Sequence, residues 1–172
     1  MTQELIDLRT SILEGRYADV LAIVDGLEGM SKQAILRNIE SFLVTMLTHL
    51  IQNQVDQCLT NSWAALISDS LQQIQTLNLK ENKTSYYIEQ DEWKPFLEEA
   101  IEAALRPASV EAMDYFYHPC QLAASVDRTD LIMTAQTLLD VTYEHSPKTL
   151  PAIIDENLVQ LPGGEEWKEG KR

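Results

Sequence analysis

The chain has 172 residues, of which 45% are hydrophobic, and this length and composition fit one globular domain and argue against disorder of the whole chain. Such a chain buries about 70% of the surface that its unfolded form exposes, so it can hold a core without metals or disulfides. The 27 acidic residues outnumber the 13 basic ones, and the net charge of −14 argues against binding to nucleic acid or to anionic membranes. The acidic residues favour solubility. Alternatively, they could bind a partner with a basic surface or mimic nucleic acid.

The N-terminal segment predicts a helix from Thr2 to Glu14, which Gly15 ends. It lacks a basic start followed by an apolar run, so it does not read as a signal peptide, and we expect a cytoplasmic protein. A second helical pattern begins at Tyr17 and loosens at Gly26 and Gly29. Two short helices are therefore expected before the main body of the protein.

The segment from Ser31 to Leu59 is the longest helical pattern in the chain. Its apolar residues recur at spacings of three and four and form two adjoining stripes, which predicts a helix covered on more than one side. The most apolar window, residues 35–51, contains Arg37, Glu40 and His49, so we expect a core helix and no membrane span.

Another helix is predicted from Trp63 to Leu77, after the capping cluster that begins at Thr60. Between Ser41 and Leu79 the charged residues are Asp56 and Asp69. Helices so poor in charge belong to the core, where the C-terminal part of the chain would cover them, or face a second subunit.

Polar residues 78–90 predict a loop that Tyr86 and Tyr87 pack back onto the bundle. A clear amphipathic helix follows from Asp91, with Pro95 tolerated in its first turn and Pro107 at its end.

The C-terminal region is broken by prolines. We expect a short helix capped by Ser109 and ended by Pro119, carrying Val110, Met113 and Tyr117. A longer helix capped by Asp127 should follow until Ser146 and Pro147 break it, then a short helix over Pro151–Leu158 and a frayed tail over Glu165–Arg172.

The predicted fold is all-α: an antiparallel bundle of four to five main helices with a shorter helical C-terminal extension. Residues 1–106 would form the core bundle, and residues 107–172 the extension packed on it within a single domain. No alternating strand pattern, hairpin signature or internal repeat contradicts this prediction.

His49 is the one polar residue of the apolar stripes that could act as a general base or a metal ligand. Its neighbours one turn away are Thr45, Met46, Gln52 and Asn53, none of which is a strong ligand. We therefore expect a hydrogen-bonded structural histidine. A ligand pocket near His49, roofed by Trp63 or by the tyrosine loop, is the alternative.

The two cysteines, Cys58 and Cys120, lie 62 residues apart and form no metal or redox motif. His118 and Cys120 could supply two zinc ligands, but a closed site needs four. The paired carboxylates fall on polar faces, and there is no Glu-x-x-His, P-loop, dinucleotide or serine-hydrolase motif. The sequence thus predicts no catalytic residue, metal site or cofactor.

Several short elements occur in a characteristic order: Glu14-Gly15-Arg16, Leu27-Glu28-Gly29, Ser31-Lys32, Leu47-Thr48-His49-Leu50 and Ser62-Trp63. In this order the chain resembles a bacterial family of uncharacterised proteins, domain of unknown function twenty-nine. The resemblance implies a compact helical bundle and brings no established activity or cofactor. The chain departs from the family in that the segment Trp63–Leu77 contains no Arg or Lys.

These observations favour a non-enzymatic, acidic protein-interaction or regulatory protein that binds neither nucleic acid nor membrane. Its partner would be another protein, for which a basic surface would be suitable, or a second copy in a homodimer. An acidic inhibitor resembling an antitoxin would be one form. The alternative is a small-ligand-binding protein or enzyme with its pocket near His49. The candidate interaction or pocket residues are His49, Trp63, Leu66, Ile67, Tyr86 and Tyr87.

Overall fold

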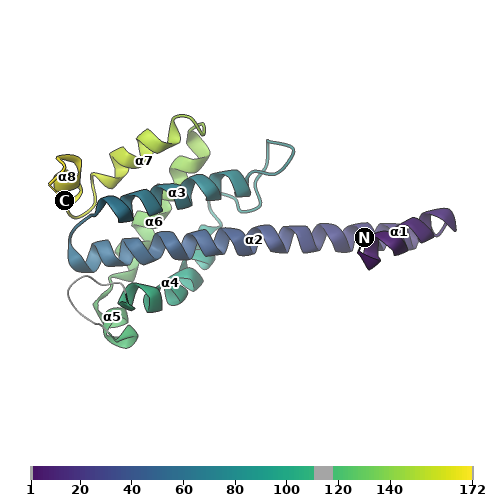
Figure 1. The fold of residues 1–172 in the computed structure, drawn as a ribbon, viewed down its shortest axis with the longest axis horizontal. Helices are drawn as coiled ribbons and strands as arrows, with labels where there is room; N and C mark the ends of the chain where they lie inside the picture. The colour runs from purple at the N-terminus through teal and green to yellow at the C-terminus, as the bar shows by residue number, and fades with distance from the viewer. Residues whose placement is uncertain (1, 111–117, 172) are drawn as a thin grey trace. The chain divides into compact units, whose positions relative to one another are not determined.

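The computed structural model describes residues 2–110 and 118–171. Its contacts divide the chain into two compact units, Met1–Arg37 and Asn38–Arg172. The helices of the described ranges are α1 (Gln3–Leu13), α2 (Tyr17–Asp56), α3 (Asn61–Asn78), α4 (Trp93–Val110), α5 (Pro119–Ser125), α6 (Arg128–Glu144), α7 (Leu150–Leu158) and α8 (Gly164–Lys168) (Figure 1). The all-α prediction is confirmed for these residues.

Helix α2 runs without interruption from Tyr17 to Asp56, so the predicted break near Gly26 and Gly29 is wrong. Neither glycine has a positive φ, and a Cβ built on either one meets nothing within 4 Å. A single helical glycine costs about 1 kcal/mol relative to alanine, which is too little to end a helix when proline is absent. Instead, α2 ends at Asp56, where Gln57 takes a φ of +51°.

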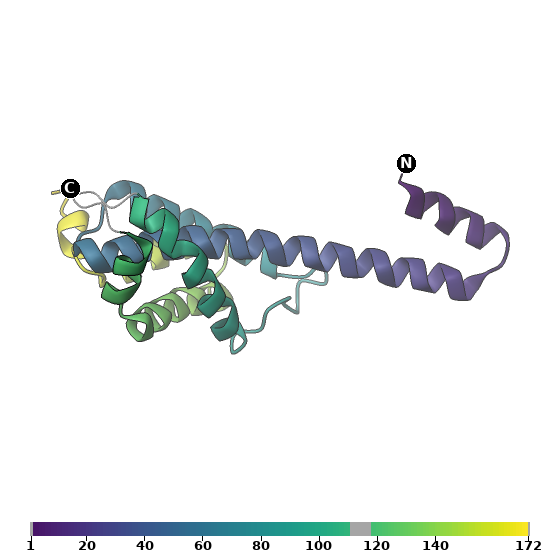
Figure 2. The same ribbon diagram turned by 90° about the horizontal axis from the view of Figure 1, so that it is seen from below.

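The first unit is a helical hairpin made of α1 and the part of α2 up to Arg37. The helices run antiparallel and are joined at Gly15, whose φ of +71° suits the turn (Figure 2). Leu8 of α1 and Ile23 and Leu27 of α2 are half-buried. Ser11 is the buried residue of this unit among those described.

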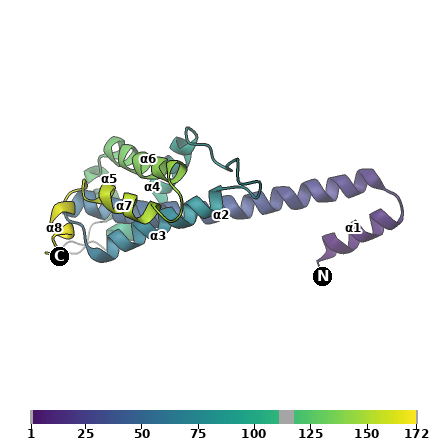
Figure 3. The same cartoon turned by 90° about the horizontal axis from the view of Figure 1, so that it is seen from above.

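The second unit has a continuous apolar core, to which α2 contributes from Ile39 onwards. Figure 1 shows α3 and α4 on opposite sides of this part of α2. Helices α3, α6 and α7 pack against one another, as Figure 3 shows, and α4 packs against α5 and α6. The largest fully buried side chains are those of Trp93, Ile39, Leu43, Met46, Leu47, Leu50, Ile51, Leu59, Ile67, Leu71, Ile74 and Ile88.

The polar caps that the sequence predicted for the second unit are largely present. Thr60 accepts a hydrogen bond from the backbone N–H of Trp63 at 3.1 Å and begins α3. The side chain of Asp127 likewise accepts a hydrogen bond from the backbone N–H of Asp130 and begins α6. Each cap satisfies an N–H that the first helical turn would otherwise leave without a partner.

Prolines mark other boundaries than those predicted. Pro107 lies inside α4, which continues to Val110, and the buried Ala108 and Ser109 hold this last turn in place. Ser109 therefore belongs to α4 and starts no new helix. Met113 and Tyr117 lie outside the described residues. Pro119 begins α5, because proline suits a first helical position, and the helix predicted before it falls largely on residues outside those described.

One further segment differs from the sequence expectations. The segment expected to fray contains α8, with Glu165 and Glu166 in its first turn and Lys168 in its last, charges that match the helix dipole. The contacts divide the chain between Arg37 and Asn38. The expected arrangement within one domain, a core over residues 1–106 and an extension over residues 107–172, stays a prediction.

Candidate functional site

His49 lies in the buried part of α2, with 6% of its surface exposed. Its Nδ1 lies 2.8 Å from the Oε1 of Gln52, and its ring stacks on Trp63 with the centroids 6.5 Å apart. The neighbour at Nδ1 is an amide, which does not titrate, so this contact forms no acid–base pair. The geometry favours the structural role expected for His49.

The charge-poor face of α3 belongs to the core of the second unit. Trp63 and Ile67 have 7% and 0% of their surface exposed, because α6 and α7 pack on α3, while Leu66 on the outer side has 40% exposed. The sequence left two alternatives for this face: cover by the C-terminal part of the chain or contact with a second subunit. In the structure, C-terminal helices cover it. A partner could reach Leu66 but not Trp63 or Ile67 without opening the unit.

Tyr86 and Tyr87 are half-buried and contact residues other than His49. The ring of Tyr86 meets the edge of Tyr143 with centroids 4.6 Å apart, and the ammonium of Lys80 lies 5.5 Å from the ring centre of Tyr87. The loop carrying them is closed by the single bridge between Leu79 and Tyr86. These contacts fasten the loop as predicted.

A buried polar cluster lies beneath this loop. The Tyr143 hydroxyl accepts hydrogen bonds from Asn78 Nδ2 at 2.9 Å and from Trp93 Nε1 at 2.7 Å. It donates one to the Ile88 carbonyl at 2.7 Å. Burial raises the pKa of Tyr143 to about 12, the direction that keeps the phenol protonated as a donor. These hydrogen bonds all connect groups within the folded chain, so the cluster has a structural role. It fastens the loop to α3, α4 and α6.

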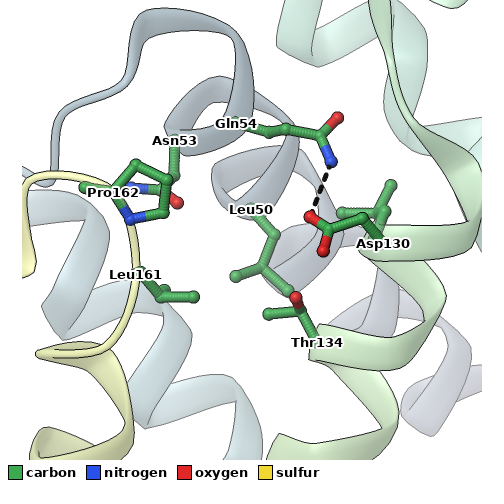
Figure 4. Close-up of a pocket in the computed structure, with 8 residues that line it drawn as sticks. Leu50, Asn53, Gln54, Asp130, Thr134, Leu161 and Pro162 are labelled. Atoms are coloured by element: carbon green, nitrogen blue, oxygen red, sulfur yellow. Dashed lines mark hydrogen bonds between the residues drawn. The ribbon is translucent and has the colours of Figure 1, made fainter.

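A second polar cluster lines a small cleft where α2, α6 and the C-terminal segment meet (Figure 4). Gln54 donates to Asp130 Oδ2 at 3.2 Å and to the Asp127 carbonyl at 3.1 Å, and accepts from the Asp127 N–H at 2.9 Å. Asn53 donates to the carbonyls of Cys58 and Pro162, each at 2.8 Å. The cleft has a volume of about 30 Å³, enough for about two waters and far below the ~300 Å³ of a small-molecule site.

The two cysteines lie in different environments. Cys58 is buried beside the turn after α2, whereas Cys120 is exposed on α5. His118 caps α5, because its Nδ1 accepts a bond from the Cys120 N–H at 3.3 Å. Within the described residues there is no group of three or more His, Cys, Asp or Glu that could hold a metal ion.

The hairpin unit Met1–Arg37 stands apart through its exposed apolar side chains. The described residues include twelve large apolar side chains that are exposed, and eight of them lie in this unit. The eight are Leu5, Ile6, Ile12, Leu13, Tyr17, Leu21, Val24 and Met30, with 42–78% of their surface exposed. The sequence predicted that residues 1–106 form the core bundle, an arrangement that would cover these side chains. The signal that this prediction missed is that each helix carries more apolar positions than one neighbouring helix can cover.

By length and composition α2 would also qualify as a membrane-spanning helix, with a mean hydropathy of 1.2 over an 18-residue window. In the structure 44% of that window is buried. The core helix of a water-soluble protein meets the same criterion, so the expected absence of a membrane span stays a prediction.

Compared with family models, with curated proteins and with solved structures, the chain matches none of them. The resemblance to the family of unknown function therefore stays a prediction, and the functional argument rests on the geometry of the chain.

Proposed function

We propose that the protein is a non-enzymatic interaction protein and that the hairpin unit Met1–Arg37 is its binding surface. The observation that carries the proposal is the concentration of eight exposed large apolar side chains within 37 residues. Exposed apolar surface of this extent is unusual on a monomeric protein and is typical of interaction sites.

The hairpin lacks the means to be stable by its own contacts. Two antiparallel helices bury little apolar surface, and helices gain most of their stability from packing of an apolar face. The contacts between α1 and α2 leave Leu8, Ile23 and Leu27 only half-buried. A further polypeptide packed on the hairpin would bury the apolar side chains that α1 and α2 leave exposed.

The exposed side chains also have the spacing of a helical docking face. Tyr17, Leu21 and Val24 follow one another at intervals of four and three and so form one stripe along α2. Leu5 and Ile12 of α1 are seven residues apart, which places them two turns apart on one face. Such stripes dock against helices or into an apolar groove.

Site-specific photo-crosslinking tests this proposal. A benzophenone side chain at position 21 of the full chain, expressed in its native cells, should give a covalent adduct with a polypeptide. The matched control is position 133, because Met133 of α6 has 64% of its surface exposed, against 63% for Leu21. Adducts from position 21 but not from 133 support the proposal. No adduct from position 21, or equal adducts from both positions, would refute it.

A further inference from the structure

The partner that fits this hairpin is a second copy of the same chain, and this inference rests on the proposed function. We propose that two hairpins pair about a two-fold axis into a four-helix bundle, with the stripe Tyr17, Leu21 and Val24 at its centre. In a closed dimer the same face serves both copies, so each stripe covers the other. Four helices then share a core that two cannot form.

The available apolar area fits a dimer interface. Five of the exposed side chains lie on the two stripes, namely Leu5, Ile12, Tyr17, Leu21 and Val24. At on the order of 100 Å² of buriable surface each, they offer a few hundred square ångströms per copy. A standard protein interface buries about 800 Å² on each partner, much of it apolar. The stripes therefore supply a large part of the apolar area that such an interface contains.

The charge distribution favours self-association through the hairpin. The hairpin unit has six acidic and four basic residues, a net charge of −2. The remaining 21 acidic and nine basic residues give residues 38–172 a net charge of −12. Two copies meeting through the second unit would place strongly acidic surfaces together, whereas two hairpins meet almost without repulsion.

Sedimentation equilibrium of the full chain from micromolar to hundreds of micromolar measures the dimer directly. We expect a dissociation constant in or below the micromolar range for the natural chain. The double substitution Leu21→Glu with Val24→Glu should weaken the dimer at least 100-fold, because it places four charges in the shared core. The control Met133→Glu with Leu66→Glu adds the same charge at exposed positions of the second unit and should leave the constant within about threefold. Circular dichroism of each variant checks that α2 remains helical. A natural chain that stays monomeric throughout, or a dimer indifferent to the hairpin pair, would overturn the proposal.

The failures of the two proposals can be told apart. An adduct from position 21 with a different protein, together with a monomer in solution, overturns the dimer but leaves the hairpin as an interaction surface. Co-sedimentation of the monomer with phosphatidylcholine vesicles, lost in the Leu21→Glu and Val24→Glu variant, would overturn the dimer in favour of a membrane surface. Adducts from position 21 with twice the mass of the chain support both proposals.

Discussion

Removing the Tyr143 hydroxyl should destabilise the second unit strongly, because three buried groups depend on it. In Tyr143→Phe, the Nε1 of Trp93 loses the acceptor that lies at 2.7 Å, and the Ile88 carbonyl loses one of its donors. The Trp93 side chain is 0% exposed, so its Nε1 has no direct contact with solvent in the folded chain. A buried donor left without an acceptor costs about 1–3 kcal/mol, and with the further lost bonds we expect about 2–3 kcal/mol.

Urea unfolding followed by tryptophan fluorescence measures this effect cleanly. All three tryptophans, Trp63, Trp93 and Trp167, belong to the second unit, so the signal is not mixed with unfolding of the hairpin. A loss of 2–3 kcal/mol lowers the urea midpoint by about 1 M or more for a protein of this size. The control is Tyr87→Phe, which keeps the ring beside Lys80 and should change stability by less than about 0.5 kcal/mol. Equal midpoints for the two variants would refute the reasoning.

The remaining predictions concern pH and glycines. Because the pKa of Tyr143 is raised from 10.0 to about 12, its stabilisation is complete below pH 10 and is lost as the pH rises through 12. Partial exposure of the phenol reduces the loss to about 1 kcal/mol, and Tyr143→Phe should abolish this slope in urea titrations. Gly163→Ala should cost 2 kcal/mol or more in the same assay, because a Cβ there would lie 2.7 Å from the Cα of Cys58 at a φ of +72°; an unchanged midpoint would contradict this. Gly26→Ala and Gly29→Ala meet open space and should each stabilise α2 by about 0.5–1 kcal/mol, seen as slower amide exchange; faster exchange would contradict it.

The sequence predicted the second unit well where short-range signals decide structure. Thr60 and Asp127 are local caps, and Ser146 and Pro147 follow shortly after the end of α6, so α3 and α6 begin and end as expected. The burial of Ile67 followed from periodicity and from the lack of nearby charges. Whether the C-terminal part of the chain or a second subunit covers it could not be decided, because contacts between α3, α6 and α7 join residues far apart in the chain.

The predictions from sequence were wrong where tertiary packing, or the lack of it, determines the structure. Gly26 and Gly29 looked like a helix end, yet a long helix absorbs two weak interruptions, and α2 continues through both. Pro107 looked like a stop, but buried neighbours hold one more turn beyond it. Periodicity also cannot say whether an apolar stripe is covered: residues 1–106 were predicted to form the core bundle, yet Leu21 and Val24 within that range are exposed.

Hydrogen exchange of the amides of residues 17–30 at two protein concentrations tests the central claim most directly. An uncovered two-helix hairpin opens easily, so these amides should exchange rapidly in dilute protein. If a second copy covers the stripe Tyr17, Leu21 and Val24, their protection should rise with concentration, while amides of the core helix α3 stay unchanged. Rapid exchange at residues 17–30 that is the same at low and high concentration would contradict the account.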